Sequence, residues 1–182
     1  MHRLARREYP DAPVVGVGAV VLDGNRVLLV RRGQEPMKGQ WSIPGGAVEL
    51  GETLEKSVRR EVAEETGLEV SVVAVVEVLE KIVVEDGGIG ESARDEPGMG
   101  HSAASRVRYH YVLVDFLCLA SGGSLHSGTD AVDARWVAHE ELNSHSFYRV
   151  APATVAVIEK AFGMTEVIAQ HKQGGGERRI PL

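Results

Sequence analysis

The amino-acid sequence predicts an α/β domain, because five apolar runs with the composition of strands are interspersed with two segments that have the pattern of helices. The apolar runs are rich in Val, Leu and Ile, and turn residues such as Gly, Asp and Asn separate several of them. The expected strands cover residues 14–22, 26–31, 68–84, 106–120 and 131–138. The expected longer helices cover residues 53–66 and 152–162.

Composition and charge narrow the possible functions. The chain has 182 residues, of which 43% are hydrophobic and 25% are charged, and these values are ordinary for a globular domain. A net charge of −6 argues against nucleic acid or an anionic membrane as a partner. No apolar stretch reaches the length of a membrane span, and charged residues precede the first apolar run, so we expect neither a transmembrane helix nor a signal peptide.

The single cysteine, Cys118, lies in the apolar run VLVDFLCLA. This setting indicates a buried, inert thiol rather than a nucleophile. One cysteine excludes an internal disulfide and suits a reducing cytoplasm, where we expect the protein to act. Because no linker or repeat divides the chain, we expect one domain over residues 14–165, with an N-terminal extension over 1–13 and a flexible tail over 166–182.

The chain begins with a strand at 14–22, a turn at Asp23-Gly24-Asn25 and a partner strand at 26–31. The loop RRGQEPMKGQ follows and leads to Trp41, which we expect to pack in the core. Two interpretations of the loop cations remain open: they contact substrate phosphates, or they form a solvated hairpin end. These cations are Arg31, Arg32 and Lys38.

Residues 53–66 have the pattern of a helix that carries a cluster of carboxylates. Thr53 is a candidate N-cap, and Gly67 stands where a C-cap falls. Because helix positions three and four apart share a face, several glutamates project from one side, beside an apolar stripe. These glutamates are Glu61, Glu64 and Glu65. Converging carboxylates repel one another unless a hard cation such as Mg²⁺ binds them, although a solvated acidic helix face would show a similar composition.

The second half of the chain is expected to add the remaining strands. The run at 68–84 is long for one strand, which indicates a bend or a bulge. Residues 85–105 are expected to form a loop, and its role stays open between a lid, disorder and a further metal ligand. The candidate ligands there are Glu85, Glu91 and Glu96. A turn at 121–124 and a short helix from His139 complete the expected elements.

One spacing in the sequence is highly specific. Gly46 is followed by five residues, then Glu52, then seven residues, and then the run REVAEETGL from Arg60 to Leu68. This pattern resembles the signature of the Nudix hydrolase family, and the approach Trp-Ser-Ile-Pro-Gly-Gly before it is similar to that family as well. Seven fixed residues match, which on background frequencies is a chance event of about one in 10⁸ at a given position.

The resemblance implies an α/β/α sandwich with a mixed central sheet. It also implies hydrolysis of a nucleoside diphosphate linked to another group, with Mg²⁺ as the cofactor and Mn²⁺ as a substitute. The partner would be a small nucleotide, and a homodimer is compatible with the family. ADP-ribose is the first expected substrate, a nucleoside triphosphate is the second, and a module that senses a nucleotide without hydrolysing it is the third alternative.

The resemblance also implies roles for individual residues. Glu61 and Glu65 are the principal metal ligands, Glu64 is a further ligand or the base, and the Gly46 carbonyl is a backbone ligand. Glu52 either binds metal or acts as the base, and Arg60 orients the carboxylates by bidentate pairing. The resemblance also implies an acidic residue from outside the signature, shortly before Trp136, that supplies a metal ligand or the base, and Asp130 is preferred there over Asp133.

Overall fold

A computed structural model of the chain describes residues 7–33, 38–85, 89–91, 106–128, 131–142, 148 and 150–174. Its elements are β1 (Val14–Asp23), β2 (Arg26–Arg32), β3 (Trp41–Ser42), β4 (Gly45–Ala47), α1 (Leu54–Thr66), β5 (Leu68–Val84), β6 (Ile89–Glu91), β7 (Val107–Gly123), β8 (Ala131–Ala138), α2 (His139–Leu142) and α3 (Pro152–Gly174).

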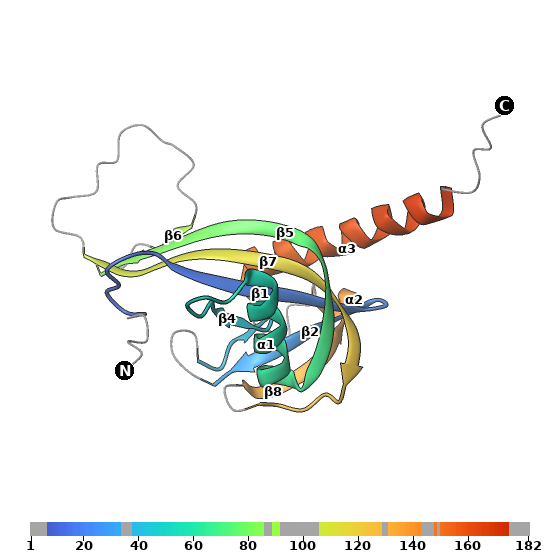
Figure 1. Cartoon of the computed structure of the whole chain (residues 1–182), viewed down its shortest axis with the longest axis horizontal. Helices are drawn as coiled ribbons and strands as arrows, with labels where there is room; N and C mark the ends of the chain where they lie inside the picture. Colours follow the sequence, from blue (N-terminus) through green and yellow to red (C-terminus); the bar gives the residue numbers. More distant parts are fainter. Residues whose placement is uncertain are drawn as a thin grey trace.

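The described strands form one eight-stranded sheet, in the order β3-β2-β1-β7-β5-β6, with β4 paired to β1 and β8 paired to β2. β1 and β7 run parallel, from Val14 opposite Tyr111 to Leu22 opposite Leu119, and the other pairs are antiparallel. α1 lies on one face of this sheet and α3 lies on the other (Figure 1). The α/β/α sandwich with a mixed central sheet is therefore confirmed.

β1 is apolar almost throughout because it contributes to the core on both faces of the sheet. Val17, Ala19 and Val21 pack in the core under α1. Val20 and Leu22 pack in the core under α3. Successive side chains of a strand point to opposite faces, so a central strand covered on both sides has no exposed face and needs no polar alternation.

α1 begins and ends as its sequence predicts. The Thr53 hydroxyl accepts a hydrogen bond of 3.3 Å from the Lys56 N–H, which satisfies one of the free donors of the first turn. Gly67 adopts the left-handed conformation at φ 68°, and its N–H donates to the Ala63 carbonyl. Val58 and Val62 are fully buried, because this side of the helix packs against the sheet.

The structure differs from the sequence-based expectation at the end of β7. Residues 121–124 were expected to form a turn, but β7 continues to Gly123, which pairs with Leu68 at the start of β5. Gly122 and Gly123 are a turn signal in the sequence, yet they pair with Glu69 and Leu68 of β5, and Gly123 does so in the left-handed conformation at φ 84°. The bulges expected in the long strand are present, since the β5–β7 register shifts at four places.

α3 also extends beyond its expected end at Phe162, reaching Gly174. Met164 and Ile168 pack against the core under α3, so burial continues past Gly163 and outweighs the weak helix propensity of that glycine. The helix therefore includes the first part of the segment that was expected to be a flexible tail. Residues 175–182 lie outside the described residues. None of the described helices is long and apolar enough to cross a membrane.

The segment 85–105 is described only in part, and three of its residues form β6, which pairs with β5. Residues 86–88 and 92–105, including the candidate ligand Glu96, lie outside the described residues. Glu85 accepts a hydrogen bond from the Tyr9 hydroxyl. The N-terminal segment thus contacts the end of β5, and the Tyr9 N–H also donates to the Arg108 carbonyl at 2.8 Å.

Candidate active site

The acidic side chains of α1 lie against a strand that has almost no side chains. On β4, Gly46 pairs with Val17 of β1, and a Cβ atom at Gly46 would collide with the Glu61 carboxylate. The Gly45 N–H donates to Glu65 Oε2 at 3.0 Å. The two glycines therefore let the β4 backbone approach the carboxylates of α1 directly, an approach that any larger residue at position 46 would prevent.

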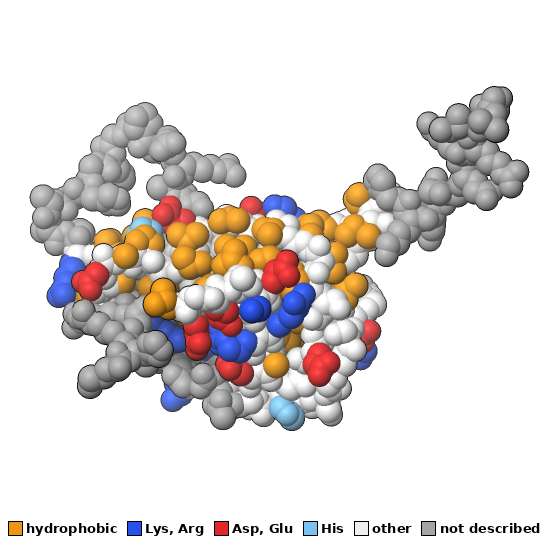
Figure 2. All heavy atoms as spheres, viewed as in Figure 1, with side chains coloured by type: hydrophobic (Ala, Val, Ile, Leu, Met, Phe, Trp, Pro, Cys, Tyr) orange, Lys and Arg blue, Asp and Glu red, His pale blue; other side chains and the backbone are white. Residues whose placement is uncertain are grey.

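Arg60 is the centre of this cluster. Its guanidinium makes a bidentate pair with Glu52, at 3.0 Å from Nε to Oε1 and 2.9 Å from Nη2 to Oε2. Its Nη1 donates to Glu61 at 2.8 Å and to Glu64 at 3.2 Å. Its Nη2 also donates to the Ala47 carbonyl at 3.2 Å. Acidic and basic side chains gather around α1 below a band of apolar side chains (Figure 2). Arg60 thus joins the loop before α1, the helix itself and β4.

Burial and hydrogen bonding shift the pKa values of the cluster's side chains in different directions. Hydrogen bonds from Arg60 lower the pKa of Glu52 to about 2, against the opposing effect of burial. Burial raises the pKa of Glu61 above its ordinary value, and its pairing with Arg60 opposes that shift. The same carboxylates raise the pKa of Arg60, chiefly through its hydrogen bonds with Glu52. The guanidinium is therefore always charged, and the three carboxylates of Glu52, Glu61 and Glu64 pair with this one cation.

The donor atoms fit a hard cation such as Mg²⁺, because the groups that converge here are carboxylate oxygens beside the half-buried backbone of β4. The Glu61 carboxylate occupies the place of the missing Gly46 side chain, so its oxygens lie directly beside the β4 backbone. Among the described residues, no group of three His, Cys, Asp or Glu side chains is already arranged around a common point. Arg60 explains this, because it binds Glu52, Glu61 and Glu64 itself.

The loop after β7 follows the C-terminal end of α1, a feature that sequence reasoning missed. The N–H groups of Ser124, His126 and Gly128 donate to the carbonyls of Gly67, Thr66 and Glu65, at 3.3, 3.0 and 2.9 Å. A Cβ atom at Gly128 would collide with the Glu64 carbonyl. The loop thus satisfies carbonyls that a helix end leaves free.

The predicted external acid, Asp130, lies outside the described residues, so its role as a metal ligand stays a prediction. The described part of the loop nevertheless ends at Gly128, hydrogen-bonded to the backbone of Glu65. Asp133, the alternative that was set aside, lies on β8 and pairs with Arg135 at 2.8 Å.

Arg31, Arg32 and Lys38 lie at the hairpin between β2 and β3, and hydrogen bonds of Arg31 and Arg32 connect its two sides. Arg31 Nε donates to the Gly39 carbonyl at 3.1 Å. The backbone of Arg32 accepts from the Gly39 N–H at 2.8 Å and donates to the Gln40 carbonyl at 3.0 Å. Lys38 lies in the turn between them. Trp41, just beyond, is only 7% exposed and meets Tyr148 edge to face at 5.2 Å, so its packing role is confirmed.

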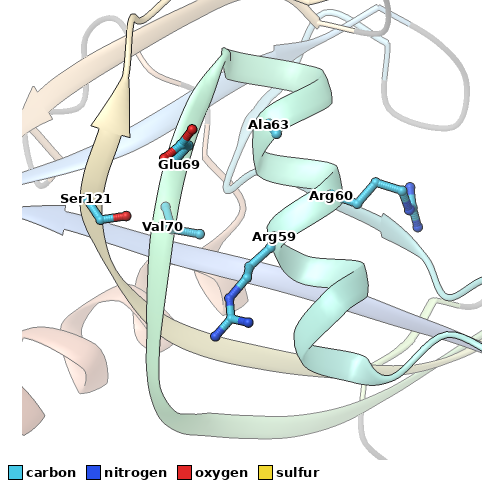
Figure 3. A pocket seen from close by; sticks show the side chains of 6 residues that line it. All are labelled: Arg59, Arg60, Ala63, Glu69, Val70 and Ser121. Carbon is cyan, nitrogen blue, oxygen red and sulfur yellow. The ribbon is translucent and has the colours of Figure 1, made fainter.

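A separate hollow of about 390 Å³ lies between α1 and the ends of β5 and β7. Arg59 points into it, near Val70 and Ser121, whereas the Arg60 side chain leaves the helix on the other side (Figure 3). Arg60 also belongs to the lining of the hollow, so the hollow and the acidic cluster adjoin at this residue. Cys118 is fully buried, as expected, and burial raises its thiol pKa to about 12, which disfavours the nucleophilic thiolate.

Comparison with known proteins decides the family. A family model described as the NUDIX domain matches residues 12–158 of the chain. The chain belongs to the Nudix family. Among curated relatives, an ADP-ribose pyrophosphatase of Methanocaldococcus jannaschii is 33% identical over 124 residues, covering 68% of this chain and 61% of the relative. A MutT-like protein of Streptomyces ambofaciens is 49% identical over 55 residues, covering 30% of this chain and 34% of the relative. The chain thus spans less than two thirds of the length of these Nudix relatives.

Solved structures support the Nudix fold. A NUDIX hydrolase from Nitrosomonas europaea superposes with a TM-score of 0.61 at 19% identity, covering 85% of this chain and 73% of the other. The NUDIX domain of Shewanella oneidensis NrtR, solved in complex with ADP ribose, superposes with a TM-score of 0.56 at 23% identity, covering 85% and 90%. At these identities the likeness establishes the Nudix fold alone.

Proposed function

We propose that this Nudix protein hydrolyses the pyrophosphate bond of a nucleoside diphosphate linked to a second group, and that ADP-ribose or a related nucleotide sugar is its substrate. The observation that carries the proposal is the Arg60 cluster, in which Glu52, Glu61 and Glu64 are held beside the bare backbone of β4. The similarity to an ADP-ribose pyrophosphatase over 68% of the chain supports the choice of substrate.

Glu61, Glu65 and the Gly46 carbonyl would hold Mg²⁺, with Mn²⁺ as a substitute. When bound, the ion neutralises the diphosphate and lowers the pKa of an attacking water. The protein itself holds the carboxylates in place. Two hydrogen bonds from Arg60 orient Glu52, and one from the Gly45 N–H orients Glu65. Arg31, Arg32 and Lys38 are proposed to contact the substrate phosphates from the neighbouring hairpin.

Glu64 is the group we propose as the base that accepts a proton from water. Its side chain is 58% exposed, whereas that of Glu52 is 15% exposed and has both oxygens occupied by Arg60. A base must reach the water whose proton it takes, and Glu64 has this access with one bond of 3.2 Å to Arg60. Asp130 remains the alternative from outside the signature.

A second candidate is a nucleoside triphosphate pyrophosphohydrolase, which the similarity to a putative 8-oxo-dGTP diphosphatase of Mycobacterium tuberculosis favours, at 46% identity over 63 residues. Both candidate functions hydrolyse a pyrophosphate bond, and they differ in the substrate that carries it. They are separated by incubating the protein and Mg²⁺ with ADP-ribose, NADH, dinucleoside polyphosphates and nucleoside triphosphates, and by chromatography of the products. Release of AMP and ribose 5-phosphate from ADP-ribose at the highest kcat/KM supports the first candidate.

The catalytic assignment is tested with Glu64→Gln and Glu65→Gln. Each variant keeps the shape of the side chain and removes its charge, so we expect kcat to fall at least about hundredfold while the thermal unfolding temperature changes little. Near-normal turnover in both variants would remove these residues from the reaction. Tight binding of ADP-ribose by the unaltered protein, with no AMP released in Mg²⁺ or Mn²⁺, would instead identify a sensing module.

A further inference from the structure

Asp115 is a buried carboxyl group in the middle of β7. Its neighbours Val114 and Phe116 pack in the core under α1, and Leu117 packs in the core under α3. Because side chains alternate along a strand, Asp115 faces the α3 side, opposite the acidic cluster. The residue is only 6% exposed, and none of the described residues donates a hydrogen bond to its carboxylate.

The Asp115 carboxyl lies over a strip of sheet that has no side chains. In the strand register Asp115 is opposite Gly18 of β1, and Gly18 is in turn opposite Gly45 of β4. A Cβ atom at Gly18 would collide with Asp115 Oδ1, and it would lie 2.9 Å from Ile43 Cδ1. The carboxyl therefore occupies the place of the missing Gly18 side chain, next to an apolar group.

This strip ends at Gly45 of β4, where the strand backbone meets a carboxylate of α1 that comes from the other face of the sheet. Asp115 and Gly45 are separated by two strand spacings, which is about 10 Å. The Gly45 N–H donates to Glu65, one of the carboxylates proposed to hold the metal. A nucleoside attached to a diphosphate at β4 is long enough to extend along the strip toward Asp115.

The packing of the fold gives no reason for a carboxyl group at this buried position. Burying a carboxylate without a partner is unfavourable, and native structures normally provide hydrogen-bond donors for such a group. Burial raises the pKa of Asp115 to about 6, with a further contribution from Glu77 on β5. Glu77 cannot act as a donor when ionised, and it is paired with Lys160 of α3 at 2.6 Å. An acceptor thus remains available to a ligand.

We propose that Asp115 is a specificity-determining residue that accepts a hydrogen bond from the exocyclic amino group of the substrate base. An ionised carboxylate only accepts hydrogen bonds, so it selects bases that present a donor. A base without that donor leaves the buried carboxylate unpaired in the complex, and such mismatches are rejected strongly. The inference rests on the proposed hydrolase function, because it names the base that the same site selects.

The test compares two substrates that differ in one group: ADP-ribose and its analogue in which hydrogen replaces the 6-amino group of adenine. The unaltered protein should show a kcat/KM for ADP-ribose at least about tenfold higher. Asp115→Val removes the acceptor while keeping an apolar, strand-forming residue, and should reduce this preference to less than about threefold. Asp115→Asn keeps a carbonyl acceptor and should restore part of the preference.

Glu77→Gln is the matched control, because it removes a charge beside Asp115 and leaves the acceptor in place. Its preference should equal that of the unaltered protein. An unaltered protein that hydrolyses both substrates equally, or a preference that survives in Asp115→Val, overturns the role of Asp115 and leaves the hydrolase function intact. Hydrolysis of neither substrate, nor of the wider panel, overturns the hydrolase function itself. If Asp115→Val does not fold, the preference of the unaltered protein and its partial retention in Asp115→Asn decide the question.

Discussion

The guanidinium of Arg60 grips the carboxylate of Glu52 through two hydrogen bonds of 3.0 and 2.9 Å, although the two residues belong to different segments. Glu52 lies in the loop before α1, and Arg60 lies in the middle of the helix. The pair is mostly shielded, with side-chain exposures of 15% and 23%. This pairing, rather than the helix alone, sets where the acidic side chains stand relative to β4.

Arg60→Lys is expected to lower kcat strongly and to destabilise the protein by about 1–3 kcal/mol. A lysine supplies a charge but cannot reproduce the fork that binds Glu52, Glu61 and the Ala47 carbonyl together. Arg59→Lys is the matched control, since Arg59 makes only an exposed pair of 3.6 Å with Glu55 and its loss should change stability by less than about 0.5 kcal/mol. Steady-state kinetics and urea unfolding measure both variants. Equal effects of the two substitutions would contradict the central role of Arg60.

Gly46→Ala is expected to reduce activity far more than stability. The added Cβ would meet the end of the Glu61 side chain, which can swing away at little cost to the fold but then leaves its position beside β4. We expect kcat to fall at least about tenfold and the free energy of unfolding to fall by less than about 1 kcal/mol. In Gly163→Ala, by contrast, the added Cβ meets nothing within 4 Å inside α3. That control should stabilise the protein by about 0.5–1 kcal/mol with activity unchanged.

Gly128→Ala is expected to damage both stability and activity. Here the added Cβ would collide with the backbone carbonyl of Glu64, which cannot rotate away, and the hydrogen bond from the Gly128 N–H to Glu65 would be lost. A loss of about 1–3 kcal/mol in unfolding free energy and a weaker affinity for Mg²⁺ by calorimetry are the expected results. Gly122→Ala meets only the flexible Glu69 side chain, at 3.0 Å, and should change neither quantity appreciably. A harmless Gly128→Ala would show that the loop does not position the helix end.

Asp115 is expected to give the stability a distinctive pH dependence. Burial raises its pKa from 3.8 to about 6 in the folded protein, so between these values the folded state binds more protons than the unfolded state. Stability attributable to this group therefore falls as pH rises from about 4 to about 6. Relative to the unaltered protein, Asp115→Val should gain up to about 3 kcal/mol across this window, as measured by urea unfolding at several pH values. Parallel curves for the two proteins would contradict a buried, titrating carboxyl.

Most of the strands, the helix α1 and its two caps could be predicted from the sequence, because each depends on neighbouring residues. Thr53 and Gly67 satisfy or terminate the backbone bonds of their own helix, and β-branched runs prefer extended structure wherever they pack. The ends of β7 and α3 were predicted wrongly for one reason. Glycines at 123 and 163 are local signals for turns and helix ends, but pairing with Leu68 and burial of Ile168 outweigh them.

The acidic side of α1 follows from the sequence alone, since a repeat of 3.6 residues places Glu61, Glu64 and Glu65 together whatever surrounds them. Tertiary structure alone decides what those carboxylates meet. The approach of Gly46, the loop that ends at Gly128, and the alignment of Asp115 with Gly18 all join segments far apart in the chain. Such contacts depend on strand register and close packing, which no single segment contains.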